Sequence, residues 1–149
     1  AGLGKIYSLW SLSFSKKNLK KSIISFLAEP NYMVLGTIGK TGMPHLTVVW
    51  FAYHDGLLKI SITKERIKYK NILRDPRLAC LIYDQKNPYR YLQVRGRVID
   101  IQEDPEYIFG DFLCERYNRD PDYRYDPVRK KEGRVTVSIK PEGRYSKGL

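Results

Sequence analysis

The stretch HLTVVWFAYHDGLLKISITKERIKYKNILRDP, residues 45–76, contains the elements that decide the fold of this chain. The segment from His45 to Tyr53 is rich in β-branched and aromatic residues, which is typical of a strand. Asp55-Gly56 is a turn sequence, and it joins this strand to a second apolar run from Leu57 to Thr63. A short helix is expected near Lys68 to Leu73, ending at Asp75-Pro76. The stretch therefore predicts antiparallel strands and a helix that begins where a strand ends.

The junction between this strand and this helix has the composition of a phosphate-binding site. Thr63 supplies a hydroxyl group, and four cations follow it in the sequence: Lys64, Arg66, Lys68 and Lys70. The start of a helix and charged side chains both bind phosphate well. The segment indicates a nucleotide-like ligand, with a solvated basic helix face as the alternative reading.

The remaining sequence adds strands and two amphipathic helices. Ser15 can cap a helix that ends at Glu29-Pro30 and places Leu19, Ile23 and Phe26/Leu27 on a core. Asp104-Pro105 begins a second helix, whose apolar stripe is Ile108, Phe109, Phe112, Leu113 and Tyr117. The other expected strands are Tyr32 to Ile38, Arg77 to Tyr83, Arg90 to Ile101 and Arg134 to Lys140.

Six short antiparallel strands with few helices predict a mainly β fold, a closed or partly closed barrel with flanking helices. The chain of 149 residues is long enough for one such domain and too short for two comfortable ones. We expect an N-terminal extension over residues 1–14, the barrel and helices over 15–141, and a tail over 142–149. The polar segment from Arg119 to Glu132 is expected to be a loop that becomes ordered on contact.

Composition limits the kinds of partner and location. The formal net charge is +11, which favours anionic partners such as nucleic acid, acidic lipid or a phosphorylated or carboxylated small molecule. Cys80 and Cys114 form no CxxC pair, so neither a disulfide framework nor a zinc site is expected, and a cytoplasmic location fits best. No membrane insertion is indicated.

The sequence contains no motif for acid–base or nucleophilic catalysis. It has no Gly-Xaa-Ser-Xaa-Gly elbow, no Walker loop and no dinucleotide fingerprint. His45 and His54 have no companion at metal-ligand spacing, so no metal site is expected. This absence is compatible with an enzyme whose redox cofactor performs the difficult chemistry.

Four segments resemble a known family, the split-barrel flavin and deazaflavin proteins related to pyridoxamine 5'-phosphate oxidase. They are residues 26–30, residues 41–45 before Val48-Val49-Trp50-Phe51, residues 66–76 and residues 88–97, and their order and spacing resemble the branch that uses coenzyme F-420. The resemblance implies a six-stranded antiparallel split β-barrel, the FMN-binding split barrel, that forms a homodimer with cofactors at the interface. The short tail, residues 143–149, lacks the substrate-binding end of true pyridoxamine-phosphate oxidases, so vitamin B6 oxidation is not expected.

The resemblance also implies a set of cofactor-binding residues. Arg66 and Lys68 would contact the phosphate, whereas Lys64 and Lys70 would be solvated. Tyr89 and Tyr91 would reach in from the partner subunit, or pack at the interface. The full set is Thr47, Val49, Trp50, Ile62, Thr63, Arg66, Lys68, Asn71, Tyr89 and Tyr91.

Three functions remain open from the sequence. The first is a coenzyme F-420-dependent oxidoreductase that transfers a hydride to or from a small organic substrate; a basic surface, including Lys16, Lys17, Lys20 and Lys21, suits the acidic tail of this cofactor. The second is an FMN-binding oxidase, reductase or electron carrier of the same fold. The third is a single-stranded nucleic-acid-binding barrel that uses Tyr89, Tyr91, Arg95 and Arg97 for stacking and phosphate contacts.

Overall fold

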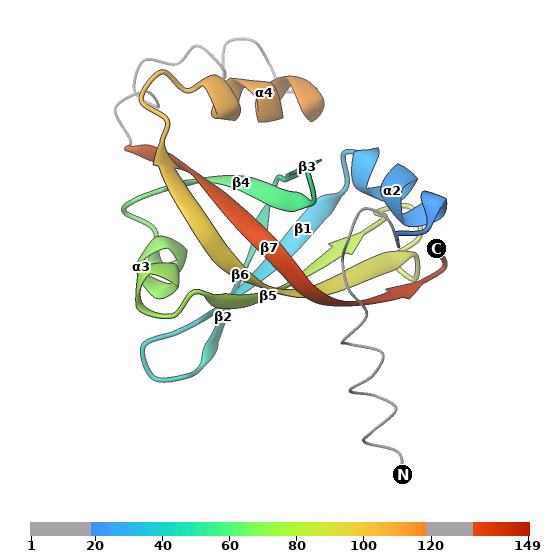
Figure 1. Cartoon of the computed structure of the whole chain (residues 1–149), viewed down its shortest axis with the longest axis horizontal. Coiled ribbons are helices and arrows are strands. Elements are labelled where there is room, and N and C mark those ends of the chain that lie inside the picture. Colours follow the sequence, from blue (N-terminus) through green and yellow to red (C-terminus); the bar gives the residue numbers. More distant parts are fainter. Residues whose placement is uncertain (1–18, 119–132) are drawn as a thin grey trace.

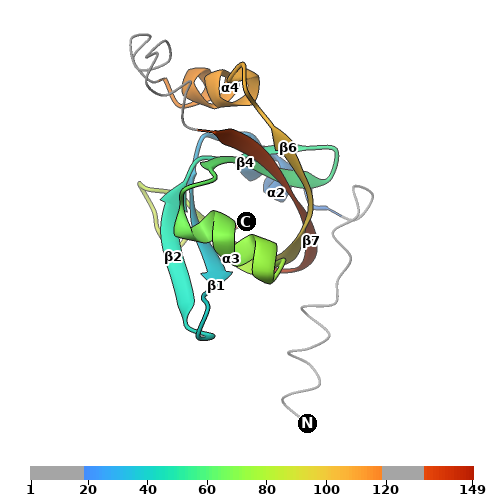
Figure 2. The same ribbon diagram turned by 90° about the vertical axis from the view of Figure 1, so that its left-hand side faces the viewer.

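The computed structural model describes residues 19–118 and 133–149, and these form one curled antiparallel sheet with three helices around it (Figures 1 and 2). The predicted Ser15 cap, the extension over residues 1–14 and the loop over residues 119–132 lie outside the described residues. The elements in chain order are α2 (Lys21–Ala28), β1 (Tyr32–Ile38), β2 (Pro44–Val49), β3 (Ala52–His54), β4 (Leu57–Thr63), α3 (Ile67–Arg74), β5 (Arg77–Tyr83), β6 (Tyr91–Glu103), α4 (Ile108–Arg116) and β7 (Arg134–Lys147).

The sheet has seven strands in the order β2-β1-β5-β6-β7-β4-β3, so the prediction of six strands is corrected to seven. The expected single strand from His45 to Tyr53 is divided at Trp50 and Phe51. There the Phe51 N–H donates to the Tyr117 hydroxyl at 3.2 Å, and the Phe51 carbonyl accepts from Arg116 at 3.0 Å. Because Phe51 bonds to the end of α4 instead of to a neighbouring strand, the pairing of the sheet stops at this point.

This break explains why the barrel is split. β2 pairs with β1 and β3 pairs with β4, so the two strands lie at opposite edges of the sheet. Only Trp50 and Phe51 connect them, and so short a connection requires the sheet to curl until its edges come near each other. The result is the predicted split barrel, with an opening between its two edges.

The last strand is longer than the sequence indicates. The predicted end at Lys140 is wrong, because β7 continues through Pro141 to Lys147. Proline has no N–H for the ladder, and the pairing with β6 shifts between Arg95 and Gly96, opposite Pro141. A Cβ atom on Gly96 would lie 2.7 Å from the Lys140 carbonyl oxygen, so glycine is needed for this close approach.

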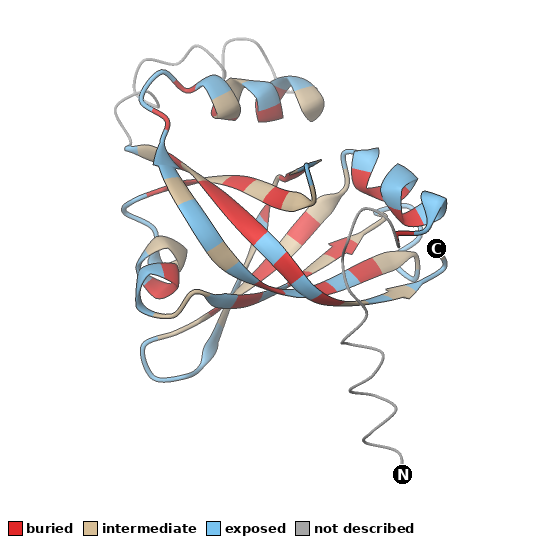
Figure 3. Cartoon of the chain, in the orientation of Figure 1, coloured by how far each residue is buried: buried red, intermediate tan, exposed pale blue. Residues whose placement is uncertain are grey.

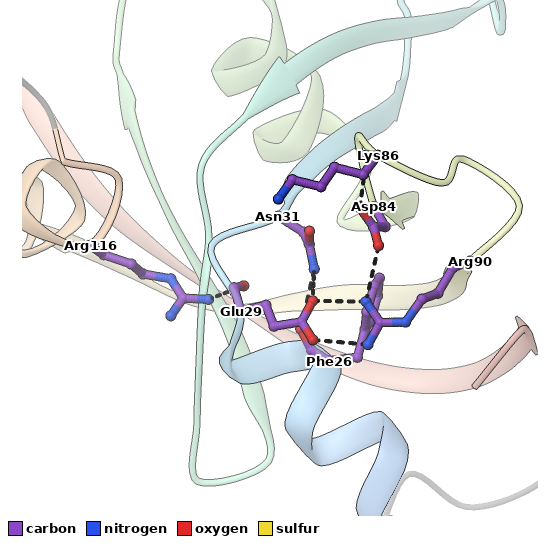
Figure 4. Close-up of polar contacts among 7 residues, drawn as sticks. All are labelled: Phe26, Glu29, Asn31, Asp84, Lys86, Arg90 and Arg116. Carbon is purple, nitrogen blue, oxygen red and sulfur yellow. Dashed lines mark hydrogen bonds and ion pairs between the residues drawn. The ribbon is translucent and has the colours of Figure 1, made fainter.

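The core lies inside the curled sheet and is closed at one end by α2. Ile23, Phe26 and Leu27 of this helix are buried, as predicted, while its other residues are mostly exposed (Figure 3). Arg90 fastens the end of the helix to the sheet. Its guanidinium makes two bonds of 2.9 Å to the Glu29 carboxylate and lies 4.9 Å from the centre of the Phe26 ring (Figure 4). This pairing holds the pKa of Glu29 below its usual value.

The helix expected after Asp104-Pro105 begins later than predicted, at Ile108, because Tyr107 adopts a left-handed conformation with φ 61°. The Asp104 carboxylate still caps it and accepts from the N–H groups of Ile108, Phe109 and Gly110. The predicted apolar stripe is wrong in part: Leu113 is buried, but Ile108 is 73% and Phe112 51% exposed. None of the helices in the described ranges is long and apolar enough to cross a membrane.

Candidate functional site

A pocket of about 230 Å³ opens where α3 and α4 approach the ends of β2 and β4. It combines aromatic and aliphatic side chains with hydroxyl groups and cations. Its lining residues are Val48, Val49, Trp50, Ser61, Ile62, Thr63, Arg66, Lys68, Tyr107, Gly110, Leu113, Cys114 and Arg134. Six of the predicted cofactor-binding residues are therefore brought together: Val49, Trp50, Ile62, Thr63, Arg66 and Lys68.

The charge of this pocket is of one sign. Three of its lining residues are cations, Arg66, Lys68 and Arg134, and none is a carboxylate. Burial lowers the pKa of Lys68, and the neighbouring charges of Arg66 and Arg134 lower it further. These three positive charges repel one another, and an anion bound between them would relieve that repulsion. The pocket therefore favours an anionic ligand.

The residues of the predicted phosphate-binding site lie at the α3 end of the pocket. Arg66 stands at the N-cap position of α3, and the Lys68 Nζ atom reaches back to donate to the Thr47 hydroxyl oxygen at 3.2 Å. Lys64 instead pairs with Glu103, and Lys70 is exposed outside the pocket lining. Arg66 and Lys68 are thus the members of the basic run that line the pocket.

Trp50 forms an aromatic wall of the pocket, and its contact with Tyr117 holds it in place. The Trp50 ring stacks on the Tyr117 ring at 5.1 Å, with the planes 10° apart. The Tyr117 hydroxyl donates to the Asn31 carbonyl at 2.6 Å, and its ring also stacks on Tyr32 at 5.8 Å. Because these contacts fix Trp50, the wall is already formed without a ligand.

Four predicted site residues lie outside this lining. Thr47 is next to it, bonded to Lys68. Asn71 is 2% exposed; its amide donates to the Thr37 hydroxyl at 3.0 Å, and its carbonyl oxygen accepts from Arg74. Tyr89 is 72% exposed, and the Tyr91 ring lies 6.3 Å from that of Tyr145. A contact of Tyr89 and Tyr91 with a partner's cofactor stays a prediction.

The sequence analysis missed the side of the pocket formed by α4 and β7. Tyr107, Gly110, Leu113, Cys114 and Arg134 all line it, although α4 follows β4 by more than forty residues. Gly110 was the available signal, because a glycine within a helix usually has a packing reason. Arg134 could be placed only from the pairing of β4 with β7, where it lies opposite Thr63.

Of the two histidines, His45 belongs to β2 and His54 is the last residue of β3. His54 is exposed and pairs with its neighbour Asp55 at 2.9 Å. Within residues 19–118 and 133–149, no three His, Cys, Asp or Glu side chains come close enough to hold a metal ion.

Comparisons with known proteins relate the chain and its fold to one family. The family described as pyridoxamine 5'-phosphate oxidase matches residues 19–147. A solved F-420 reductase is 35% identical over 85% of this chain and 98% of its own, with a TM-score of 0.77. A conserved hypothetical protein from Mycobacterium tuberculosis is 29% identical over 87% and 84% of the two chains, with a TM-score of 0.68.

The same fold also has other uses. A heme storage protein from Vibrio cholerae is 16% identical over 88% of this chain and 96% of its own, with a TM-score of 0.66, and so shares the fold alone. No curated protein matches the sequence. The fold therefore does not define the activity, which must be argued from the pocket.

Proposed function

Because the chain belongs to the pyridoxamine 5'-phosphate oxidase family, we propose that it is an oxidoreductase that uses the deazaflavin coenzyme F-420. It would transfer a hydride to or from a small organic substrate. The similarity to an F-420 reductase supports this cofactor. A cytoplasmic location remains a prediction.

One observation carries the proposal. The predicted phosphate ligands Arg66 and Lys68 line the same pocket as Val49, Trp50 and Thr63. A deazaflavin needs cations for its phosphate, an apolar wall for its flat ring and polar groups for the ring carbonyls. The pocket offers all three, so the residues present fit this cofactor.

The chain's own residues would bind and orient the reactants. Arg66 and Lys68 would hold the phosphate by charge-assisted hydrogen bonds. Trp50, kept rigid by Tyr117, would limit where the ring can lie. Leu113 and the buried part of α4 would exclude water from the other side. The cofactor itself supplies the hydride chemistry, and we assign no protein acid or base.

A homodimer forms part of the proposal. The pocket of about 230 Å³ is smaller than the roughly 300–1,000 Å³ that usually encloses a ligand of this size, so one chain would leave the cofactor partly uncovered. β2 presents Leu46 and Val48 outward, 66% and 59% exposed. Val48 lines the pocket, and Leu46 lines a second, more apolar groove of about 800 Å³ across the outer face of the sheet. A second copy covering this groove and the exposed face of β2 would reach the pocket.

Replacing Leu46 by glutamate is expected to convert the dimer into a monomer, because the variant loses an apolar contact and must desolvate a carboxylate at the interface, which costs more than pairing with the arginines of the groove returns. Light scattering coupled to size exclusion measures the mass. Ile24→Glu is the matched control, since Ile24 is an exposed apolar residue on α2, outside the groove. A Leu46→Glu protein with the mass of the unmodified dimer would contradict this interface.

Titration with coenzyme F-420, followed by its fluorescence, tests the cofactor. Saturable binding at micromolar concentrations or below is expected, and no saturable binding would rule the proposal out. FMN would use the same phosphate ligands. A protein that purifies yellow, with an oxidised-flavin spectrum and FMN identified by mass spectrometry, would assign FMN instead.

A further inference from the structure

Arg134 is the third cation of the pocket, and its guanidinium is held in a defined position. It lies 5.1 Å from the centre of the Tyr107 ring, within the range of a cation–π contact. One of its terminal nitrogens donates to the Ser61 carbonyl at 3.3 Å. β7 begins at Arg134, opposite Thr63 of β4, so the backbone under the side chain is fixed by the sheet. Arg134 is therefore preorganised at the pocket wall.

The position of the Tyr107 ring is itself determined by α4. Tyr107 is 2% exposed and has the left-handed conformation that precedes the helix. A Cβ atom on Gly110 would lie 2.5 Å from the Tyr107 ring, so the ring occupies space that only a glycine leaves open. The Asp104 carboxylate fixes this turn through three backbone N–H groups. The Tyr107 ring, at the start of α4, is therefore a fixed surface against which the Arg134 guanidinium lies.

The three cations of the pocket come from two parts of the fold, although Arg134 lies near enough to Lys68 to lower its pKa. Arg66 and Lys68 come from the start of α3, whereas Arg134 comes from β7 beside α4. Figures 1 and 2 both show α3 and α4 on opposite sides of β4. If Arg66 and Lys68 hold the cofactor phosphate, Arg134 is the remaining cation of this lining and can take another anionic group. The lining residues that α4 contributes, Gly110, Leu113 and Cys114, carry no charge.

We propose that Arg134, in its cation–π contact with Tyr107, binds the carboxylate of the substrate. The enzyme therefore prefers carboxylate-bearing small molecules to neutral ones of the same shape. This inference rests on the proposed function, because it takes the α3 end as the cofactor's. Arginine suits this task because its planar pair of donors matches a carboxylate.

The test compares two electron-poor aromatic probes, 4-nitrobenzoate and its methyl ester, which differ mainly in charge. Calorimetric titration into the full chain saturated with oxidised coenzyme F-420 gives their Kd values. The acid is expected to bind at least about tenfold more tightly than the ester, and Arg134→Gln is expected to remove that preference. Arg134→Lys, which keeps the charge but loses the fork, should retain part of it.

Arg144→Gln is the matched control, because Arg144 is also a partly buried arginine of β7 but does not line the pocket. It should leave the preference unchanged. Equal binding of acid and ester by the unmodified chain, or a preference that survives in Arg134→Gln, would overturn the inference.

Coenzyme titration of Arg134→Gln separates the two possible sources of the anion. A coenzyme Kd within about threefold of the unmodified value supports a substrate role, whereas a loss of more than about tenfold would assign Arg134 to the cofactor and overturn the inference. If the unmodified chain binds no coenzyme, the proposed function fails by itself. The same two probes titrated into the chain without coenzyme then decide the role of Arg134.

Discussion

Replacing Arg66 and Lys68 together by alanine is expected to weaken coenzyme binding by about 2 kcal/mol or more, at least about 30-fold in Kd. Both residues line the pocket, and the double change removes two charge-assisted contacts to one phosphate. Lys68 contributes from a partly buried position, where water screens its charge less than at the surface. Fluorescence titration of the coenzyme measures the effect, and circular dichroism checks the fold.

The matched control removes the same amount of charge from the same segment. Lys64 and Lys70 flank the pair in sequence, but neither lines the pocket. Lys64→Ala with Lys70→Ala should keep the Kd within about threefold, because exposed charges act weakly at physiological salt. If both double variants lose affinity equally, the basic run acts only as a diffuse positive field. If neither does, Arg66 and Lys68 are part of a solvated helix face.

Replacing Arg116 by alanine is expected to lower the free energy of unfolding by about 3 kcal/mol. Its guanidinium donates to four backbone carbonyls, at 2.7 to 3.0 Å: those of Leu27, Ala28, Glu29 and Phe51. The bond to Glu29 is drawn in Figure 4. One side chain thus joins the end of α2, the break between β2 and β3, and α4. Urea denaturation, with its slope compared between variants, measures the loss.

Arg97→Ala provides the reference for this change. Arg97 pairs with Glu142 at 3.2 Å, and both side chains are about half exposed. A surface pair of this kind contributes about 0–1 kcal/mol, so Arg97→Ala should change stability little. Similar losses in both variants would mean that the four carbonyl contacts contribute no more than a surface ion pair.

Because Tyr117 follows Arg116 and supports Trp50, Arg116→Ala should also alter Trp50 fluorescence in a Trp10→Phe background.

Much of the fold could be predicted because its signals are local. The fourth predicted strand, Arg77 to Tyr83, has the bounds of β5, and the alternation along β6 places Leu92 and Val94 inside and Arg95 and Arg97 outside. The strand break at Trp50 and Phe51 was missed, since these residues have high strand propensity and are diverted by Arg116 and Tyr117, far away in sequence.

The start of α4 was missed for a similar reason. Asp104 does cap the helix, but the left-handed Tyr107 shifts its first turn and rotates its faces, so that Ile108 becomes exposed. The extension of β7 past Pro141 includes a register shift opposite Arg95 and Gly96 of β6, where β7 has one extra residue, Glu142. In each case a contact between distant segments overrode a local preference.

The sequence by itself determined the mainly β fold, the family resemblance and the basic strand-to-helix segment with Arg66 and Lys68, because strand alternation, turns and helix ends depend on neighbouring residues. Only the tertiary structure decided where the barrel splits, which cations share one pocket, and that Arg134, beside the Tyr107 ring, is one of them. The physical reason is that β4, α4 and β7 meet through sheet pairing and packing across long stretches of chain, and a one-dimensional pattern carries no record of such contacts.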